Sequence, residues 1–159
     1  MIDRAAIAAS FAEAAHRGQV RKFSGGPYIR HPGRVADILR VAGYDDADMI
    51  SAAYLHDVIE DTGVTYPVLE CVFGDDIATL VAELTKPNQP RTDRAKLIKC
   101  ADIMDNVSTI WLDAGREYAA QYLQQKLQQL GAMYPDGSNS KLSADAFKMV
   151  QGEIARMAK

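Results

Sequence analysis

The chain has 159 residues, of which 48% are hydrophobic and 25% charged, and its formal net charge at neutral pH is −3. This length and composition fit one globular domain with a substantial core, and the acidic balance argues against a protein that coats nucleic-acid polymers. Two cysteines, Cys71 and Cys100, are too few for a disulfide framework. With no signal-peptide core and no apolar run long enough to cross a bilayer, the sequence predicts a cytoplasmic protein without a membrane partner.

Helical periodicity and a polar loop occupy the first part of the chain. Ile7, Phe11 and Ala14 have helical spacing and predict an amphipathic helix from Ile2 to His16. Residues 18–32 are polar and contain a Gly-Gly-Pro run, so they predict a long loop, a type of segment that often carries function. A second helix is then expected from Pro32 to Val41.

The rest of the chain predicts further helices and no strand. They are expected at 47–61 with Asp45 or Asp46 as cap, at 66–73 capped by Thr65, at 75–85, at 94–112 after a short linker (Lys86–Asp93), at 117–133, and from a cap at Ser143 to about Met157. Within this part, Cys71 is expected to be a small buried side chain. No segment alternates with period two and no repeat occurs, so the predicted fold is all-α, a single-domain helical bundle over residues 1–159.

The stretch from Ala52 to Thr62 has an acidic face. On a helical wheel, an arc of roughly 140° holds one imidazole and three carboxylates, those of His56, Asp57, Glu60 and Asp61. Carboxylates that close repel one another, and a bound divalent cation removes the conflict. The alternative is a solvated acidic face with a chance histidine.

Two other positions extend this hypothesis. His31 precedes Pro32 at the end of the polar loop, and Asp102 shares a helix face with Asn106 and Thr109. A metal ion could be bound by four side chains, the imidazoles of His31 and His56 and the carboxylates of Asp57 and Asp102. Mixed imidazole and carboxylate ligation suits Mn²⁺, Fe²⁺ or Zn²⁺ better than Mg²⁺ or Ca²⁺.

The region from His16 to Arg40 is basic although the whole chain is acidic. It holds six arginines and lysines against one acidic residue, Asp37. Such a local positive region fits a small polyanionic ligand better than a long polymer.

Six short blocks in order carry a family resemblance. They are AHRGQVRK at 15–22, PYIRHP at 27–32, LHDVIEDT at 55–62, FG at 73–74, LTK at 84–86 and KCAD at 99–102. In this order the blocks resemble the HD-domain hydrolase module of RelA/SpoT-type enzymes, and most closely the small stand-alone alarmone hydrolases. The resemblance runs from about His16 to Thr109 and implies an HD-type helical bundle.

The resemblance implies roles for the acidic and imidazole side chains. It implies that one Mn²⁺-like ion is held by His31, His56, Asp57 and Asp102. It also implies that Glu60 and Asp61 are the paired carboxylates beside the attacking water, where one of them orients the water or takes its proton. Which of the two is the base stays open, because adjacent carboxylates titrate as a coupled pair.

The resemblance also implies a nucleotide substrate. The family cleaves the 3′-pyrophosphate of guanosine tetra- or pentaphosphate and releases pyrophosphate with GDP or GTP. By similarity, six residues contact the nucleotide: Arg21, which would stack on the base, Lys22, which would meet a phosphate, and Ser24, Asn106, Thr109 and Tyr122.

Two departures from the family pattern concern the substrate. Ile103-Met104-Asp105 stands where a basic or hydrophobic pair is usual, and the connection from Lys86 to Arg94 is short. The alternative function is an HD phosphohydrolase acting on another nucleotide, such as the adenosine analogue or the 2′-phosphate of NADPH. A helical domain that senses nucleotides without turnover is a third reading. The sequence leaves a homo-oligomer open.

Overall fold

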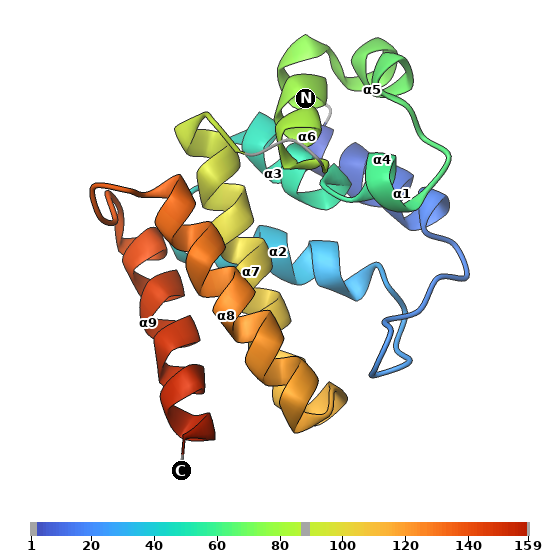
Figure 1. Cartoon of the computed structure of the whole chain (residues 1–159). Coiled ribbons are helices and arrows are strands. Elements are labelled where there is room, and N and C mark those ends of the chain that lie inside the picture. Colours follow the sequence, from blue (N-terminus) through green and yellow to red (C-terminus); the bar gives the residue numbers. More distant parts are fainter. Residues whose placement is uncertain (1–2, 87–89, 159) are drawn as a thin grey trace.

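A computed structural model describes residues 3–86 and 90–158, with the backbone alone at 111–113 (Figure 1). Within these residues the chain is helical, and a single β-bridge joins Val20 to Pro27, which confirms the predicted all-α class. The helices are α1 (Arg4–Ala15), α2 (Arg30–Val41), α3 (Ala47–Leu55), α4 (Val58–Asp61), α5 (Tyr66–Phe73), α6 (Asp75–Leu84), α7 (Asp93–Asp113), α8 (Arg116–Met133) and α9 (Lys141–Met157).

The helices form two groups that meet along α2 and α7. On one side α1, α3, α5 and α6 pack together, and on the other α7, α8 and α9 lie side by side (Figure 1). Helix α2 contacts both α3 and α7, so it joins the two groups. This arrangement brings the first turn of α2 against the middle of α7, although they are about seventy residues apart in sequence.

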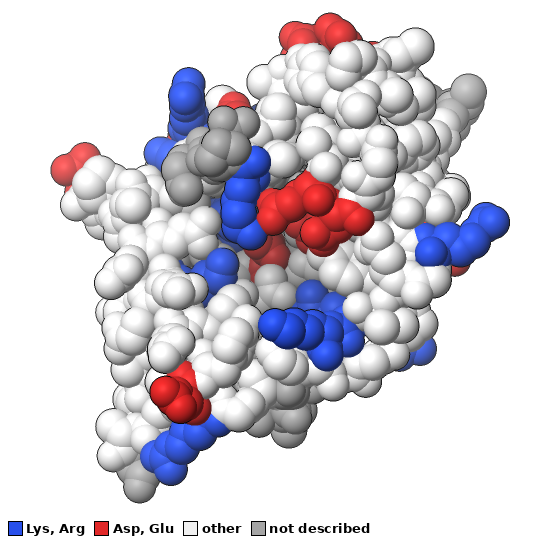
Figure 2. All heavy atoms as spheres, turned by 45° about the vertical axis from the view of Figure 1, so that its right-hand side comes forward, with Lys and Arg blue, Asp and Glu red and all other residues white. Residues whose placement is uncertain are grey.

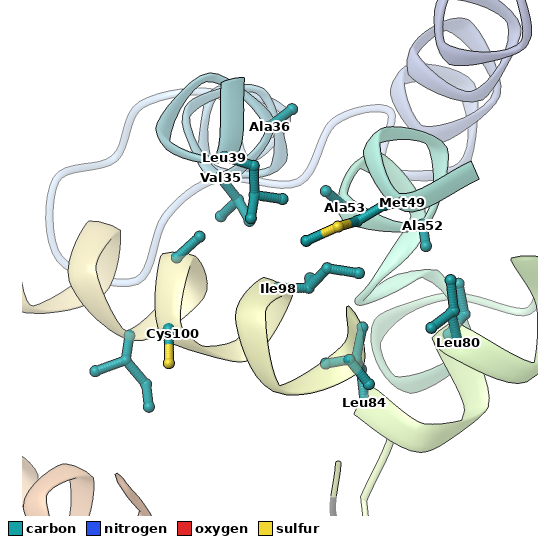
Figure 3. Packing of buried hydrophobic residues seen from close by; sticks show 14 of the residues in the cluster. Val35, Ala36, Leu39, Met49, Ala52, Ala53, Leu80, Leu84, Ile98 and Cys100 are labelled. Carbon is teal, nitrogen blue, oxygen red and sulfur yellow. The ribbon is translucent and has the colours of Figure 1, made fainter. Parts of the chain in front are cut away.

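Small and branched side chains fill the junction. Figure 3 shows apolar residues of α2, α3, α6 and α7 that point into this junction: Val35, Leu39, Met49, Ala52, Ala53, Leu80, Leu84 and Ile98. Cys100 is buried on the other side of α7. Alanines on α2 and α3 let the backbones approach, and the larger aliphatic side chains fill the space between them. The buried core holds the elements that carry the acidic and imidazole side chains in fixed positions.

The predicted continuous helix over 47–61 is wrong. Helix α3 ends at Leu55, the short α4 begins at Val58, and His56 and Asp57 lie in the break. The Nδ1 atom of His56 lies 2.8 Å from the Ala53 carbonyl, which would accept the Asp57 amide in a continuous helix. The side chain of His56 therefore competes with the helix backbone at this point.

Other boundaries also differ from the prediction. Helix α2 begins at Arg30, so His31 belongs to its first turn and does not precede it. Ser140, and not Ser143, caps α9. Ser143 is the third residue of the helix and completes a reciprocal capping box with Ser140. Cys71 is exposed, not buried. Part of the predicted linker Lys86–Asp93, residues 87–89, lies outside the described residues.

None of the described helices is both long and apolar enough to cross a lipid bilayer.

Candidate metal centre and adjoining pocket

The structure brings together the four side chains of the predicted ligand set. His31 comes from α2, His56 and Asp57 from the break between α3 and α4, and Asp102 from α7. His31 Nε2 lies 3.2 Å from Asp102 Oδ1 and 3.6 Å from Asp57 Oδ2. His56 Nε2 lies 2.9 Å from Asp57 Oδ2 and 3.7 Å from Asp102 Oδ1. Three segments distant in sequence thus meet at one point.

Both histidines present the same ring nitrogen to this point. The Nδ1 atom of His56 is paired with the Ala53 carbonyl, and that of His31 lies 2.6 Å from Asp105 Oδ2. These partners favour a proton on Nδ1, which leaves the Nε2 lone pairs directed at the carboxylates. Among the described residues, the buried Nε2 atom of His56 makes no hydrogen bond of good geometry, although Asp57 Oδ2 lies 2.9 Å away. An unpaired buried nitrogen of this kind is what a bound cation would satisfy.

The donor set fits a divalent metal ion. Bonds of about 2.0–2.2 Å to nitrogen and oxygen keep neighbouring donor atoms roughly 3–4 Å apart. The four imidazole–carboxylate distances, from 2.9 to 3.7 Å, are close to that range, although Asp57 lies outside the tightest group of three donors. Donor atoms of His31, His56 and Asp102 all lie within 4.8 Å of one another, and these three residues are buried. Two neutral imidazoles with two carboxylates would match a doubly charged ion.

The charges of the cluster depend on one another. Burial alone would raise the pKa of Asp102, but the Lys99 ammonium and the two imidazoles hold that pKa well below its usual range. Burial likewise opposes ionisation of Asp57, whose pKa is lowered by adjacent His56. Burial would lower the pKa of His56, yet Asp57 and Asp102 raise it to about 10. The pair of carboxylates thus requires a positive charge beside it, from a proton or from a metal ion.

Asp105 fixes His31 from behind, a role that the sequence analysis missed. Its side chain is only 3% exposed, and its two oxygens accept from Arg34 at 2.5 and 3.0 Å as well as from His31. Burial opposes its ionisation, but the bonds from His31 and Arg34 lower its pKa. His31 and Asp105 are too far apart in sequence for spacing to reveal the contact.

Tyr28 is a second residue that the sequence analysis missed. Its hydroxyl donates to Asp57 Oδ2 at 2.5 Å, and its ring lies against His16 at 4.7 Å between centroids. Burial and the charge of Asp57 raise the pKa of Tyr28, so it remains a donor. Tyr28 stands three residues before His31, and at the start of α2 this spacing places the two side chains on the same side. That spacing is the signal in the sequence that could have indicated Tyr28.

The two predicted catalytic carboxylates lie on α4, beside the cluster. Glu60 is 31% exposed at its side chain, and its Oε1 accepts from Lys86 Nζ at 2.7 Å. Asp61 is exposed, and its backbone carbonyl accepts from Gln19 of the loop before α2. Both residues line the same cavity as His31, Asp57 and Asp102.

That cavity has a volume of about 690 Å³ and combines both signs of charge. Figure 2 shows a hollow with acidic atoms in its depth and at its rim, and basic side chains on two opposite sides. The basic residues that line it are Arg21, Lys22, Lys86, Lys99 and Lys126. The hollow therefore suits a ligand with several negative charges whose reactive group reaches an acidic, cation-binding centre.

Five of the six predicted nucleotide contacts border this space. Arg21, Lys22, Asn106 and Tyr122 line the cavity, and Thr109 lines a smaller adjoining pocket of about 190 Å³. Arg21 already donates to Asn106 Oδ1 at 2.7 Å. Ser24 is exposed in the loop and is not among the lining residues described.

Comparisons with known proteins agree with this geometry. A family model described as HD domain matches residues 8–102. A probable guanosine-3′,5′-bis(diphosphate) 3′-pyrophosphohydrolase of Synechocystis is 50% identical over 76 residues, which are 48% of this chain and 10% of that protein. The guanosine-3′,5′-bis(diphosphate) 3′-pyrophosphohydrolase MESH1 of Danio rerio is 36% identical over 133 residues, 73% of this chain and 74% of the relative.

A solved structure shares the fold over nearly the whole chain. The structure of a metazoan ortholog of SpoT, described as hydrolysing ppGpp, superposes with a TM-score of 0.81 at 26% identity and covers 96% of each chain. The family model includes both histidines and both aspartates of the cluster, and the solved structure extends the likeness of the fold into the C-terminal helices. With its helical fold and its cluster of two histidines and two aspartates, the chain belongs to the HD-domain family.

Proposed function

We propose that the protein is a metal-dependent phosphohydrolase that removes the 3′-pyrophosphate of guanosine tetra- or pentaphosphate, with release of pyrophosphate and GDP or GTP. The observation that carries the proposal is the convergence of two Nε2 atoms and two carboxylates beside a cavity with basic walls. The relatives named for this reaction support the choice of substrate. We further propose that residues 1–159 act as one domain, since α8 and α9 pack on α7. We also propose that this domain is cytoplasmic.

His31, His56, Asp57 and Asp102 would hold the ion, which we propose to be Mn²⁺. When bound, a divalent ion supplies Lewis-acid polarisation of water and phosphate oxygens. Tyr28 and Asp105 hold Asp57 and His31 in place through the hydrogen bonds described above. Because these partners are themselves buried or packed, the ligand set is ordered before a nucleotide arrives.

Glu60 and Asp61 are proposed as the carboxylates that handle the proton of the attacking water. One of them orients the water and takes its proton while the water oxygen bonds to the phosphorus attached to the 3′ oxygen. The bond between that phosphorus and the 3′ oxygen breaks, and the 3′ oxygen gains a proton. Lys86, paired with Glu60 at 2.7 Å, holds that carboxylate in place at the cavity.

Arg21 and Lys22 are proposed to bind the nucleotide at the other side of the cavity. The planar guanidinium of Arg21, held by Asn106, can stack on the base, and Lys22 provides a point charge for phosphate. Tyr122, Thr109 and Ser24 complete the proposed set, of which Tyr122 and Thr109 border the pocket.

A substrate panel tests the proposal directly. Purified full-length protein with Mn²⁺ should release pyrophosphate from guanosine tetraphosphate faster than it releases phosphate from NADPH or pyrophosphate from the adenosine analogue. If the protein hydrolysed either of these two nucleotides faster, that nucleotide would be assigned as the substrate in place of guanosine tetraphosphate. Absence of turnover with all three nucleotides at micromolar enzyme would reject an enzymatic role.

Removal of the metal is expected to destabilise the fold. A ligand at one hundred times its dissociation constant stabilises the native state by about 2.7 kcal/mol, which in a chain of this size corresponds to a melting temperature higher by about 5–10 °C. Treatment with EDTA should therefore lower the melting temperature by that amount, and Mn²⁺ should restore it. A melting temperature that is unchanged by both treatments would contradict a metal that joins α2, α3 and α7.

Asp105→Asn is expected to lower metal affinity by about ten- to hundredfold, because it weakens the hydrogen bond that orients His31 and retains a side chain of the same size. Competition with a metal-sensitive dye measures the effect without turnover. Asp37→Asn, at an exposed residue of α2, is the matched control and should bind metal as the wild-type chain does. Equal affinities in the two variants would show that Asp105 does not position His31.

A further inference from the structure

One face of α8 runs along the cavity from end to end. Tyr118, Tyr122, Lys126 and Gln129 follow one another at helical spacing, and all four line the cavity. With a rise of about 1.5 Å per residue, Tyr118 and Lys126 are separated by roughly 12 Å along the helix axis. Along α8 the lining of the cavity thus changes from aromatic rings to an ammonium group and an amide, and the Lys126 ammonium lies beside the Tyr122 ring where the two parts meet.

Helix α7 repeats this division from the opposite wall. It precedes α8 in the chain and packs against it, and its cavity-lining residues run from Asn106 through Asp102 to Lys99. Arg21 and Lys22 lie at the aromatic end, where they share the smaller pocket with Tyr118 and Tyr122. The opposite end, which we call the lysine end, consists of Lys86, Lys99, Lys126 and Gln129.

At the lysine end, Lys126 differs from the other two lysines in its partners. Lys86 is paired with Glu60, and Lys99 is paired with Asp102, each at 2.7 Å. Lys126 instead donates to the neutral Gln129 Oε1 at 3.2 Å, and its ammonium lies 5.0 Å from the centre of the Tyr122 ring. No carboxylate among the described residues lies within ion-pair distance of it.

The surroundings of Lys126 favour an anionic ligand. Burial lowers the pKa of Lys126, Asp102 opposes this effect, and the nearby charges of Lys99 and Lys86 add to it. A half-buried ammonium close to two further ammonium groups is stabilised by an anion, whose oxygens can accept from more than one of them. A pyrophosphate group, which carries several charges on a short chain, matches that need better than a single carboxylate.

We propose that Lys126, together with Lys99, binds the pyrophosphate group that the reaction releases, at the end of the cavity opposite the nucleoside. The inference rests on the proposed function for the identity of this anion. The nucleoside lies against the aromatic rings and Arg21, the scissile bond lies at the ligand cluster between the two ends, and the departing pyrophosphate lies against α8 and α7. Lys126 is then a binding residue for the pyrophosphate group of the substrate, which water attacks, and for the pyrophosphate product, whereas the 3′ oxygen of the nucleotide is the leaving group.

Product inhibition tests the assignment on the full-length, Mn²⁺-loaded protein. Lys126→Met retains the apolar stem and removes the charge, and it should raise the inhibition constant of pyrophosphate about ten- to hundredfold, the effect of losing a hydrogen bond to a charged group. The inhibition constant of GDP should change less than about twofold by the same scale, since GDP keeps its contacts at the other end. Lys126→Arg should keep most of the affinity for pyrophosphate.

Two further measurements make the test decisive. Lys148→Met, at an exposed lysine of α9, is the control and should leave both inhibition constants unchanged. Titration calorimetry of pyrophosphate into the metal-loaded wild-type and Lys126→Met proteins gives the same comparison without turnover, so that it stands even if guanosine tetraphosphate is not the substrate. Unchanged pyrophosphate affinity in Lys126→Met, or an equal loss for GDP, would overturn the assignment while leaving the hydrolase proposal intact.

Discussion

Asp102→Ala is expected to remove the bound metal and to lower the rate of hydrolysis by about a thousandfold or more. Asp102 Oδ1 lies within 3.7 Å of both imidazole Nε2 atoms, so its loss breaks the ligand set at its centre. Loss of the ion removes its stabilisation of charge in the transition state, an effect of several kcal/mol, and each 1.36 kcal/mol corresponds to a tenfold change in rate. Metal content by elemental analysis and pyrophosphate release measure the two consequences.

Asp102→Ala is also expected to lower the stability of the fold, so controls must separate this effect from the loss of metal. Lys99 is only 14% exposed at its side chain and is paired with Asp102, so alanine leaves a largely buried ammonium without that partner. Asp102→Asn, which retains the shape, should also lose the metal, and Asp145→Ala on α9 should retain it. A folded Asp102→Ala protein that holds one metal ion per chain would rule out Asp102 as a ligand.

Glu60→Gln should keep the metal and lower the catalytic rate by about 10²–10⁴-fold, the usual contribution of a positioned acid or base. The amide has the same size as the carboxylate but cannot take a proton. Glu60 is not within the cluster of donor atoms, and its ion pair with Lys86 lies near the surface, so the melting temperature should change little. The rate constant at saturating nucleotide, compared with metal content, measures this separation.

Asp61→Asn distinguishes the two carboxylates. If Glu60 is the base, Asp61→Asn should have a smaller effect than Glu60→Gln, and the reverse order would assign the proton to Asp61. Lys86→Met removes the partner of Glu60 and should lower the rate less than Glu60→Gln does, because it leaves the carboxylate in place. If the two single variants Glu60→Gln and Asp61→Asn both kept full activity, neither carboxylate would be a catalytic group.

Much of the fold could be predicted because it depends on local patterns. The apolar spacing along α6, α7 and α8 gave bounds within one residue of those in the structure. The continuous helix over 47–61 was wrong because a side-chain contact, from His56 to the Ala53 carbonyl, interrupts it, and periodicity does not report such a contact. Cys71 shows the same limit, since an apolar neighbourhood in sequence does not determine which face of α5 is covered.

The residues of the candidate site also fall into those that could be predicted from the sequence and those that could not. The imidazoles and carboxylates could be named from residue type and family resemblance, because their chemistry marks them. Tyr28, Asp105 and Lys126 could not, because each acts through a partner that folding supplies: Asp57 for Tyr28, His31 for Asp105, and the walls of the cavity for Lys126. Asp105 in particular looked like a departure from the family pattern, whereas in the structure it supports His31.

The loop before α2 is attached to the rest of the protein at three points. Gln19 donates to the Asp61 carbonyl, Arg21 to Asn106 and Tyr28 to Asp57. Since the loop is anchored in advance, an incoming nucleotide need not organise it, and the entropy of ordering a flexible segment is not lost on association. Encounter should then proceed in one kinetic phase whose rate depends on electrostatic steering and falls as salt increases, without a slow step of loop closure.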